Sequence, residues 1–432
     1  MNNLPPSTSQ PSSGMESPFW LEWAIRALVF LFPITVATTG WGSEIFLLLV
    51  APALYYGRGW SMLSQWEKRL LLGYVAVFVV MSLSMLNAEE LREGGKALER
   101  YLRFVLLIPV YLMFRRYGFT FGRELALGAV VAAMLMLGQA LYQVEWQGMP
   151  IAEGYYHKIV FGDLAVWWAA VTTLFAVTIV RSWKLRLALV VVVFMALYAS
   201  LLSQTRGAWL FVPVFPVILI WAQWGHVKAM RKWVVAGGLA GLGLLVIVGT
   251  QSEQLKGGFE RGINELEVFV KHPEAETSWG IRLNLWRNSL LLLKETPLLG
   301  TGVGDFQADM KRMVEDGRSW NKYVANYNHA HSIYIDTLVK GGVLGFVVMV
   351  TSFLLLPFIA FVRVVRSAEQ PRERFYAVGG VLLIAAFATF GLSEGLWSRN
   401  PFVNTYVICL VVFMAGMVNS RKKADAELDK RL

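Results

Sequence analysis

The sequence predicts an all-α integral membrane protein with about twelve transmembrane helices and one large external loop that contains amphipathic helices. Hydrophobic residues make up 56% of the chain and charged residues 16%, and the mean hydropathy is +0.49. A soluble domain of this length would need more charge to remain in water. Apolar runs of about 20 residues, each long enough to cross the ~30 Å hydrocarbon core as a helix, recur along the chain. Lys and Arg gather in alternate connections between these runs, as in the cytoplasmic loops of membrane proteins.

The predicted spans follow the apolar runs in order. They cover residues 20–39, 41–56, 70–86, 98–114, 121–143, 161–180, 187–202, 208–224, 234–250, 332–362, 375–392 and 401–419. Residues 1–17 are rich in Ser, Pro, Asn and Gln and lack a basic segment before a short apolar core, so we expect a disordered tail and not a cleaved signal peptide. Cys409 is the only cysteine and lies within the last predicted span, which excludes an intrachain disulfide.

The distribution of basic residues predicts the orientation of the chain. The basic clusters lie around residues 58–69, 115–123, 181–186, 228–232, 363–374 and 421–423, and they fall on one side if every predicted span crosses once. That side is expected to be the cytoplasm, with both termini on it. The net charge of +10 therefore reflects orientation, and we do not expect nucleic acid as a partner.

This orientation divides the chain into five predicted parts. They are a disordered cytoplasmic tail (1–17), spans one to nine (18–250), an external loop with the active-site helices (251–331), spans ten to twelve (332–420) and a basic cytoplasmic tail (421–432). The external loop is far longer than the usual connection between packed elements, and loops of this size usually carry function.

Within this loop, one segment predicts an amphipathic helix lying on the membrane surface. Thr277 and Ser278 are capping residues, and apolar residues from Leu283 to Leu293 recur at helical spacing. Arg282 and Trp286 are four residues apart, so the guanidinium and the indole are expected on the same flank of this helix. An arginine that extends to the interface beside a tryptophan would explain the pair equally well.

Two further segments reach the same face. Gly300, Gly302 and Gly304 predict a tight turn, but no Gly-Lys-Ser/Thr follows, so this is not a nucleotide-binding phosphate loop. A loop that folds back over the helix explains these glycines at least as well as ligand contact does, and we place no site residue there. Arg206 lies in the Ser-Gln-Thr-Arg-Gly segment 203–207, between the seventh and eighth spans. It could simply cap the seventh helix, where a cation suits the negative end of the helix dipole.

Two of the five histidines, His329 and His331, precede the tenth predicted span. His331 lies beside Ser332, a natural N-cap, so its imidazole is expected near the positive end of a helix dipole, which disfavours the protonated form. A neutral imidazole can act as a general base. The alternative is a surface histidine that caps the helix or packs against the interface, and His329 fits this alternative.

The predicted orientation places Arg206, Arg282 and His331 on one membrane face, although they come from three parts of the chain. Two permanent cations and one titratable base suit a substrate with a phosphate leaving group and a hydroxyl nucleophile. The sequence has no Asp-x-Asp pair, no His-Glu-x-x-His motif and no Cys/His metal spacing, and Asp305 with Asp309 is only weak evidence for a divalent ion. We therefore expect catalysis without a metal or other cofactor.

Three motifs occur in a fixed order along the chain. They are Ser-Gln-Thr-Arg-Gly at 203–207, Arg282 with Trp286 and the turn 297–302, and His329-Ala330-His331-Ser332 leading into the glycines at 341, 342 and 345. In this order they resemble the bacterial O-antigen ligase and polymerase superfamily. The resemblance implies a GT-C-like, lipid-linked oligosaccharide glycosyltransferase of the inner membrane with a periplasmic active site. It also implies a donor glycan on undecaprenyl pyrophosphate and a sugar hydroxyl of lipid A–core as acceptor, both embedded in membrane lipid.

The resemblance also implies roles for single residues. Arg206 and Arg282 match the family's pyrophosphate-binding arginines, and His331 matches its catalytic histidine. The family more often places Asn after this histidine, where the present chain has Ser332. Other candidates for substrate contact are Trp286, His329, Arg100 and Arg103. The last two could equally pair with the glutamates at positions 89, 90, 93 and 99.

Rival functions follow from the same sequence. An O-antigen polymerase shares the arginines and the histidine but tends to divide its external mass between two loops, and a protein O-oligosaccharyltransferase would take a polypeptide hydroxyl as acceptor. A lipid flippase or transporter would bury ionisable residues or broken helices near the middle of the membrane. Most charges here lie near the ends of the predicted spans, and Asp336 with Lys340 is the main exception.

Overall fold

The computed structural model describes residues 17–223 and 264–429, and its regular secondary structure is helical throughout that part of the chain. The all-α prediction is confirmed. The helices are α1 (Phe19–Thr38), α2 (Gly42–Tyr56), α3 (Gln65–Ser84), α4 (Leu91–Arg116), α5 (Gly122–Leu141), α6 (Lys158–Thr178), α7 (Trp183–Leu202), α8 (Arg206–Trp209), α9 (Val214–Gln223), α12 (Ser278–Glu295), α13 (Phe306–Glu315), α14 (Ile333–Met349), α15 (Leu356–Ser367), α16 (Pro371–Phe390) and α17 (Asn400–Asp429). The predicted ninth span, 234–250, and residues 1–16 of the predicted tail lie outside the described residues.

Eight helices in the described ranges are long and apolar enough to cross a membrane, which makes the chain a multi-pass membrane protein. They are Phe19–Thr38, Gln65–Asn87, Gly122–Trp146, Lys158–Thr178, Trp183–Leu202, Ile333–Ser367, Pro371–Phe390 and Asn400–Ala424. The predicted second and eighth spans correspond to shorter apolar helices, Gly42–Tyr56 and Arg206–Ala222. The predicted fourth span lies in α4, whose first half carries many charged residues. The count of twelve therefore stays a prediction.

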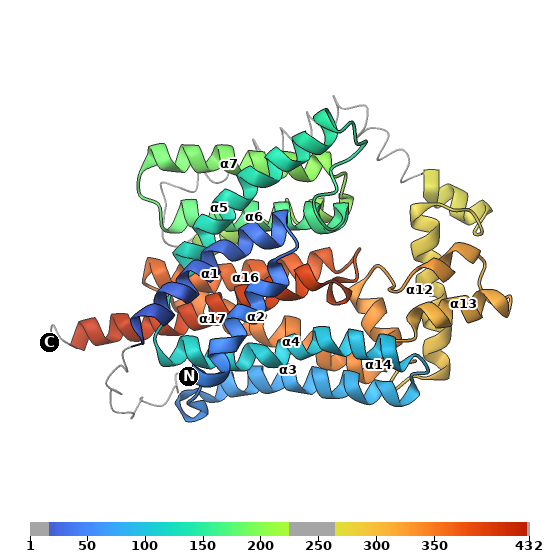
Figure 1. Ribbon diagram of the computed structural model, residues 1–432, viewed down its shortest axis with the longest axis horizontal. Coiled ribbons are helices and arrows are strands. Elements are labelled where there is room, and N and C mark those ends of the chain that lie inside the picture. The colour runs from blue at the N-terminus through green and yellow to red at the C-terminus, as the bar shows by residue number, and fades with distance from the viewer. Residues whose placement is uncertain (1–16, 224–263, 430–432) are drawn as a thin grey trace.

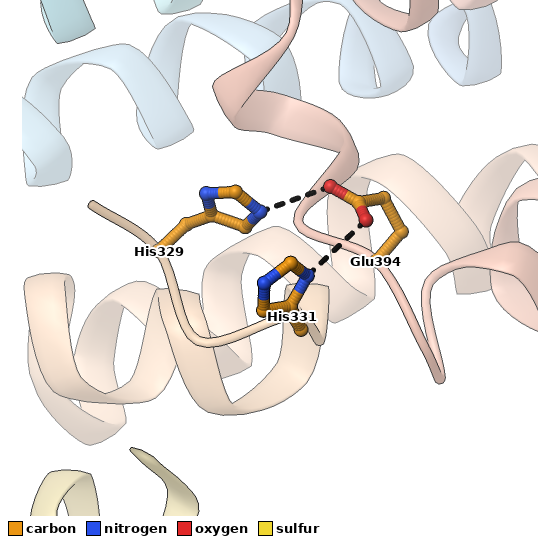
Figure 2. Close-up of side chains that lie close together, drawn as sticks. All are labelled: His329, His331 and Glu394. Atoms are coloured by element: carbon orange, nitrogen blue, oxygen red, sulfur yellow. Dashed lines mark hydrogen bonds and ion pairs between the residues drawn. The ribbon is translucent and has the colours of Figure 1, made fainter. Parts of the chain in front are cut away.

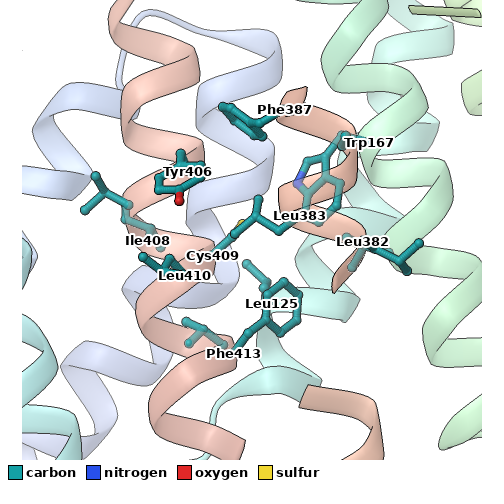
Figure 3. Packing of buried hydrophobic residues seen from close by; sticks show 14 of the residues in the cluster. Leu125, Trp167, Leu382, Leu383, Phe387, Tyr406, Ile408, Cys409, Leu410 and Phe413 are labelled. Carbon is teal, nitrogen blue, oxygen red and sulfur yellow. The ribbon is translucent and has the colours of Figure 1, made fainter. Parts of the chain in front are cut away.

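Three helices form the centre of the bundle. The share of the apolar window that is buried is 89% in α6, 83% in α16 and 94% in α17, against 28% in α7. Figure 3 shows how Trp167 of α6, Leu383 of α16 and Cys409 of α17 meet at this centre. These helices supply a rigid frame because their side chains pack on all sides, whereas the outer helices keep one apolar face free for lipid.

The helices α12 and α13 cover one end of the bundle. Figure 1 shows α12 running across that end and α13 beside it, while the C-terminal end of α17 lies at the opposite end. Thr277 accepts a hydrogen bond from the Gly280 amide at 3.0 Å, so the predicted N-cap of the 278–295 helix is confirmed. The buried face of α12 packs against α13 and α14. The helix α12 therefore lies against the start of α14.

The helix α14 is broken near its middle, and the glycine turn fills the break. Gly342 has φ of 64° and ψ of −170°, which interrupts the helical hydrogen bonds. The amides of Thr301 and Gly302 donate to the freed carbonyls of Val339 and Lys340 at 2.9 and 3.2 Å. In return, the amides of Val343 and Leu344 donate to the carbonyls of Pro297 and Leu298 at 2.9 and 3.2 Å. The turn thus packs against α14, a partner that neither explanation of its glycines had named.

The same turn is fixed to the start of α4. Both carboxylate oxygens of Asp305 accept backbone amides, from Glu89 at 2.7 Å and Glu90 at 2.8 Å. The Asn87 side chain donates to the Gly300 carbonyl at 2.8 Å. Because both Asp305 oxygens bind the backbone just before α4, this carboxylate has a structural task, and the evidence for a divalent ion at Asp305 and Asp309 becomes weaker still.

Candidate active site

The centre of the candidate site is Glu394, which lies in the connection between α16 and α17 and is fully buried. Its Oε1 lies 3.0 Å from Nε2 of His329 and accepts a hydrogen bond from Nε of Arg399 at 2.8 Å. Its Oε2 lies 3.3 Å from Nδ1 of His331. Figure 2 shows both imidazoles pointing at the same carboxylate from one short loop. One buried anion therefore organises two histidines and one arginine.

The histidine loop is held in an uncommon backbone conformation. His331 has φ of 50°, a left-handed value that side chains other than glycine rarely adopt. The carbonyl of Ala330 accepts the indole N–H of Trp286 at 2.8 Å, and its amide donates to Asp336 Oδ1 at 3.0 Å. Ser332 occupies the N-cap position of α14 as predicted, but its side chain makes no capping hydrogen bond. The cost of the left-handed residue is offset by these contacts on either side of it.

The surroundings of the cluster favour a neutral His331 beside a charged Glu394. Burial lowers the pKa of His331, and the neighbouring His329 and Arg282 lower it further, although Glu394 acts in the opposite direction. Burial would raise the pKa of Glu394, but hydrogen bonds from both histidines and the charge of Arg399 outweigh it and hold that pKa well below its usual range. An ionised Glu394 needs a donor, so Nδ1 of His331 carries the hydrogen. This leaves the lone pair on Nε2 free to accept a proton.

The two predicted arginines stand close to this cluster. Arg282, on α12, is partly buried, and its guanidinium lies 5.9 Å from the Trp279 ring. Burial lowers the pKa of Arg282, the charge of Glu394 raises it, and the charge of Arg206 lowers it, so both groups lie within electrostatic reach. Within residues 17–223 and 264–429, neither arginine forms an ion pair with a carboxylate. The structure therefore brings Arg206, Arg282 and His331 together at one end of the bundle.

Arg206 is placed by a short turn between α7 and α8. Gln204 has φ of 54°, and the Thr205 hydroxyl donates to the carbonyl of Lys158, the first residue of α6, at 2.8 Å. The Ser203 hydroxyl donates to the Thr205 hydroxyl at 2.8 Å. Arg206 itself is exposed and begins α8, so it does not cap α7. The polar residues around Arg206 in the 203–207 motif thus tie this turn to the central helix α6.

The structure differs from the predictions for Trp286 and His329. The indole beside Arg282 belongs to Trp279, and Trp286 instead supports the histidine loop through Ala330. The interpretation of His329 as a surface histidine is wrong, because this residue is 6% exposed and its Nε2 is bonded to Glu394. Its side chain lies in the cluster because a buried carboxylate, which the sequence did not reveal, attracts it.

The other two predicted arginines, Arg100 and Arg103, lie on α4. The Arg103 guanidinium is buried and donates to Glu99 at 2.9 Å and to Asn404 at 2.7 Å, so the predicted pairing with a glutamate is confirmed. The charge of Arg100 interacts with that of Asp336 at the start of α14. With its guanidinium bound inside the protein, Arg103 is poorly placed for substrate contact.

The sequence did not identify Glu394 as a site residue. The carboxylate and His331 are far apart in the sequence, and no periodicity connects them. The one signal was an acidic residue in a short connection between two strongly apolar runs. His157 was also missed, and the charges of Arg399 and Glu394 act on it from nearby.

The donor set also has the chemistry of a metal site. His329, His331 and Glu394 each offer one ligand atom, and these atoms lie within 4.8 Å of one another. Two imidazoles and one carboxylate can hold a divalent transition metal. Against this, Arg399 already donates to one Glu394 oxygen and brings a positive charge that would repel a cation. Catalysis without a metal stays a prediction that a chelator tests.

The chain is similar to known proteins over the segment that contains these residues. Residues 188–350 match the family model described as O-Antigen ligase, and this segment contains Arg206, Arg282 and His331. An uncharacterized protein from Haemophilus influenzae is 22% identical to this chain over 406 residues, which cover 91% of this chain and 98% of the relative. The similarity to this relative extends over nearly the full length of both chains.

Proposed function

Since its match to the family model makes this chain a member of the O-antigen ligase superfamily, we propose that it is an O-antigen ligase. It transfers a glycan from undecaprenyl pyrophosphate to a sugar hydroxyl of lipid A–core at the periplasmic face of the bacterial inner membrane. The observation that carries the proposal is the meeting of two arginines without carboxylate partners among the described residues and a histidine with a free Nε2 at one end of the helical bundle. These are the groups that a phosphate leaving group and a hydroxyl nucleophile need.

The reaction divides between these groups. The acceptor hydroxyl oxygen forms a bond to the anomeric carbon of the donor, and its proton passes to Nε2 of His331. The bond from the anomeric carbon to the pyrophosphate oxygen breaks, and its electron pair stays on undecaprenyl pyrophosphate. Arg206 and Arg282 stabilise the charge that develops there. A single displacement of this kind inverts the anomeric configuration.

Glu394 and Arg399 prepare the base. Glu394 accepts the Nδ1 hydrogen of His331, which fixes the tautomer and stabilises the imidazolium that forms during transfer. Hydrogen bonds from His329 and His331, together with the charge of Arg399, keep the carboxylate ionised inside the protein. Arg206 and Arg282 belong to elements other than the histidine loop. The residues that bind the leaving group are therefore held in place independently of the residue that takes the proton.

The test is glycan transfer by the purified protein in detergent with lipid-linked donor and lipid A–core acceptor. We expect His331→Ala to lower kcat by about 10²–10⁴-fold and Arg282→Ala by about 10²–10³-fold. Matched controls are His272→Ala, an exposed histidine, and Arg287→Ala on α12, whose guanidinium stacks on Trp320 at 3.9 Å. Full activity of both site variants would contradict the proposal, and loss of activity with chelator alone would contradict the metal-free mechanism.

The same assay separates the rival functions. A polymerase would lengthen the lipid-linked glycan without joining it to core, and a protein O-oligosaccharyltransferase would need a polypeptide acceptor. A flippase needs a sealed bilayer, so transfer in detergent excludes it. A product that retains the donor's anomeric configuration would rule out direct attack by the acceptor.

A further inference from the structure

An ion pair lies buried directly beneath the candidate site. Nζ of Lys340 lies 2.8 Å from Asp336 Oδ1, one helical turn away on α14, and the two residues are 6% and 3% exposed. Charged residues are rarely buried to this degree, and removing two charges from water costs several kcal/mol each. A pair of apolar residues of similar size would hold two helical turns together at least as well. The pair therefore calls for an explanation beyond stability.

Its hydrogen bonds reach the two segments that build the site. Asp336 accepts the Ala330 amide at 3.0 Å, and Lys340 donates to the Asn328 carbonyl at 3.3 Å. On the other side, the Ser398 hydroxyl donates to Asp336 Oδ2 at 3.3 Å and lies 3.5 Å from Lys340 Nζ. One segment carries both histidines and the other carries Arg399. The pair thus connects the two sides of the Glu394 cluster.

The pair is itself held in place by the turn 297–302 and by α13. The carbonyl of Lys340 accepts the Gly302 amide at 3.2 Å, at the break in α14. The Lys340 ammonium lies 5.3 Å from the ring of Phe306, the first residue of α13. Because the turn and α13 hold Lys340 in place, the pair can transmit a fixed geometry to the loop above it and does not merely follow that loop.

We propose that Asp336 and Lys340 are positioning residues of the active site. They hold the 328–330 loop so that His331 keeps its left-handed backbone and its Nδ1 faces Glu394. They hold the 396–399 segment so that Arg399 stays on the other oxygen of the same carboxylate. This inference rests on the proposed function for its kinetic consequence, while its structural consequence can be measured without any substrate.

The structural test measures the reactivity of single histidines with diethyl pyrocarbonate by mass spectrometry. His331 and His329 report on the loop, and His272, whose side chain is 67% exposed, is the internal reference in the same chain. In Asp336→Asn we expect the labelling rate of His331, relative to His272, to rise at least fivefold, because the loop loses its anchor. Glu22→Gln is the matched control, since Glu22 and Arg26 form an exposed pair with the same spacing on α1, and we expect no change there.

A second variant separates positioning from stability. Asp336→Asn leaves Lys340 buried without its partner and can destabilise the fold, whereas Asp336→Asn with Lys340→Met removes both charges. We expect the double variant to recover the thermal stability of the native chain and still to label faster at His331. Asp336→Glu keeps the charge, so we expect slower labelling than in Asp336→Asn and partial recovery of kcat.

The kinetic test uses glycan transfer by the same variants. We expect the double variant to lower kcat at least 30-fold while the KM for the donor changes less than threefold, because Arg206 and Arg282 lie on other elements. Unchanged labelling and unchanged kcat in the double variant would overturn the proposal. So would an unfolded double variant, since the pair would then serve stability alone. If labelling rises but the native protein transfers no glycan, the positioning role stands and the proposed function falls.

Discussion

Glu394 accepts hydrogen bonds from three cationic or potentially cationic side chains while it is fully buried, and this decides the protonation of its neighbours. A carboxylate in that position stays ionised only because donors surround it. With the carboxylate charged, His331 presents its Nδ1 hydrogen inward and its Nε2 lone pair outward. A residue that contacts no substrate in this scheme thus sets which nitrogen reacts.

Replacing Glu394 by Gln tests this role. We expect Glu394→Gln to lower kcat by about 100-fold, because the amide neither fixes the tautomer nor stabilises the imidazolium. The KM for the donor should change little. The control is Glu315→Gln, an exposed residue at the end of α13, which should leave kcat unchanged. Steady-state kinetics with the purified variants decide the matter, and a kcat for Glu394→Gln within threefold of the native value would exclude an orienting role.

The pH dependence follows from the lowered pKa of His331. A general base loses activity as pH falls through its own pKa, and burial places that pKa below the ordinary value of 6.5. We therefore expect the acid limb of kcat/KM to lie below pH 6.5. In Glu394→Gln the limb should move further down, because Glu394 raises the pKa of His331. A limb above 6.5 in the native protein would indicate a different base.

Part of this site could be predicted from residues alone. Arg206, Arg282 and His331 belong to short motifs with a chemical rationale, and the charge pattern placed them on one face. Glu394 could not be predicted in the same way, because its role depends on a contact between a loop before α14 and the connection after α16. The pairing of Arg282 with Trp279 and not Trp286 depends on rotamers that helical spacing does not determine.

At the scale of single elements, the break in α14 matters most. Gly342 divides a segment that reads as one continuous apolar run, and the turn 297–302 supplies the four missing hydrogen bonds. The turn was predictable from Gly300, Gly302 and Gly304. Its partner was not, because glycines such as Gly341 and Gly342 also occur in unbroken apolar helices and do not by themselves reveal a break. The result is an irregular segment whose polar backbone groups are satisfied within the protein.

A methyl group at this break should be costly. A Cβ on Gly342 would lie 2.2 Å from the Leu298 carbonyl oxygen, and the residue has positive φ. We expect Gly342→Ala to destabilise the protein by about 2–3 kcal/mol and to lower its Tm in detergent. The control is Gly95→Ala on α4, where a Cβ meets nothing within 4 Å and alanine should be neutral or stabilising by up to about 1 kcal/mol. Equal Tm values for the two variants would contradict this account of the break.

On the scale of the whole molecule, three buried helices form the centre of the bundle, and the candidate site lies at one end of it. The helices α6, α16 and α17 are nearly surrounded by protein, and α12 with α13 covers one end of the bundle (Figure 1). The sequence predicted a membrane protein and most of its long helices because hydropathy is summed over about 20 residues. The count of twelve spans stays a prediction, because short or charged segments such as Gly42–Tyr56 and α4 resemble spans by composition and the predicted ninth span lies outside the described residues.

The predicted orientation can be tested with single cysteines. Cys409 is fully buried, so the native chain should give little background with a membrane-impermeant maleimide. We expect Asp316→Cys, at the end of α13, to be labelled in intact spheroplasts. Glu369→Cys, between α15 and α16, should be labelled only after lysis. The opposite pattern would place the candidate site in the cytoplasm and exclude a periplasmic acceptor.

The position of Glu394 and Arg399 outside the segment 188–350 limits how far this protein can be shortened. A fragment with that segment alone would hold the histidines and both site arginines but would lack their counterion. His331 would then have no acceptor for its Nδ1 hydrogen, and the charges of Arg206 and Arg282 would act on each other without the opposing charge of Glu394. The smallest unit that can be catalytically competent therefore extends at least through Arg399, into the first turn before α17.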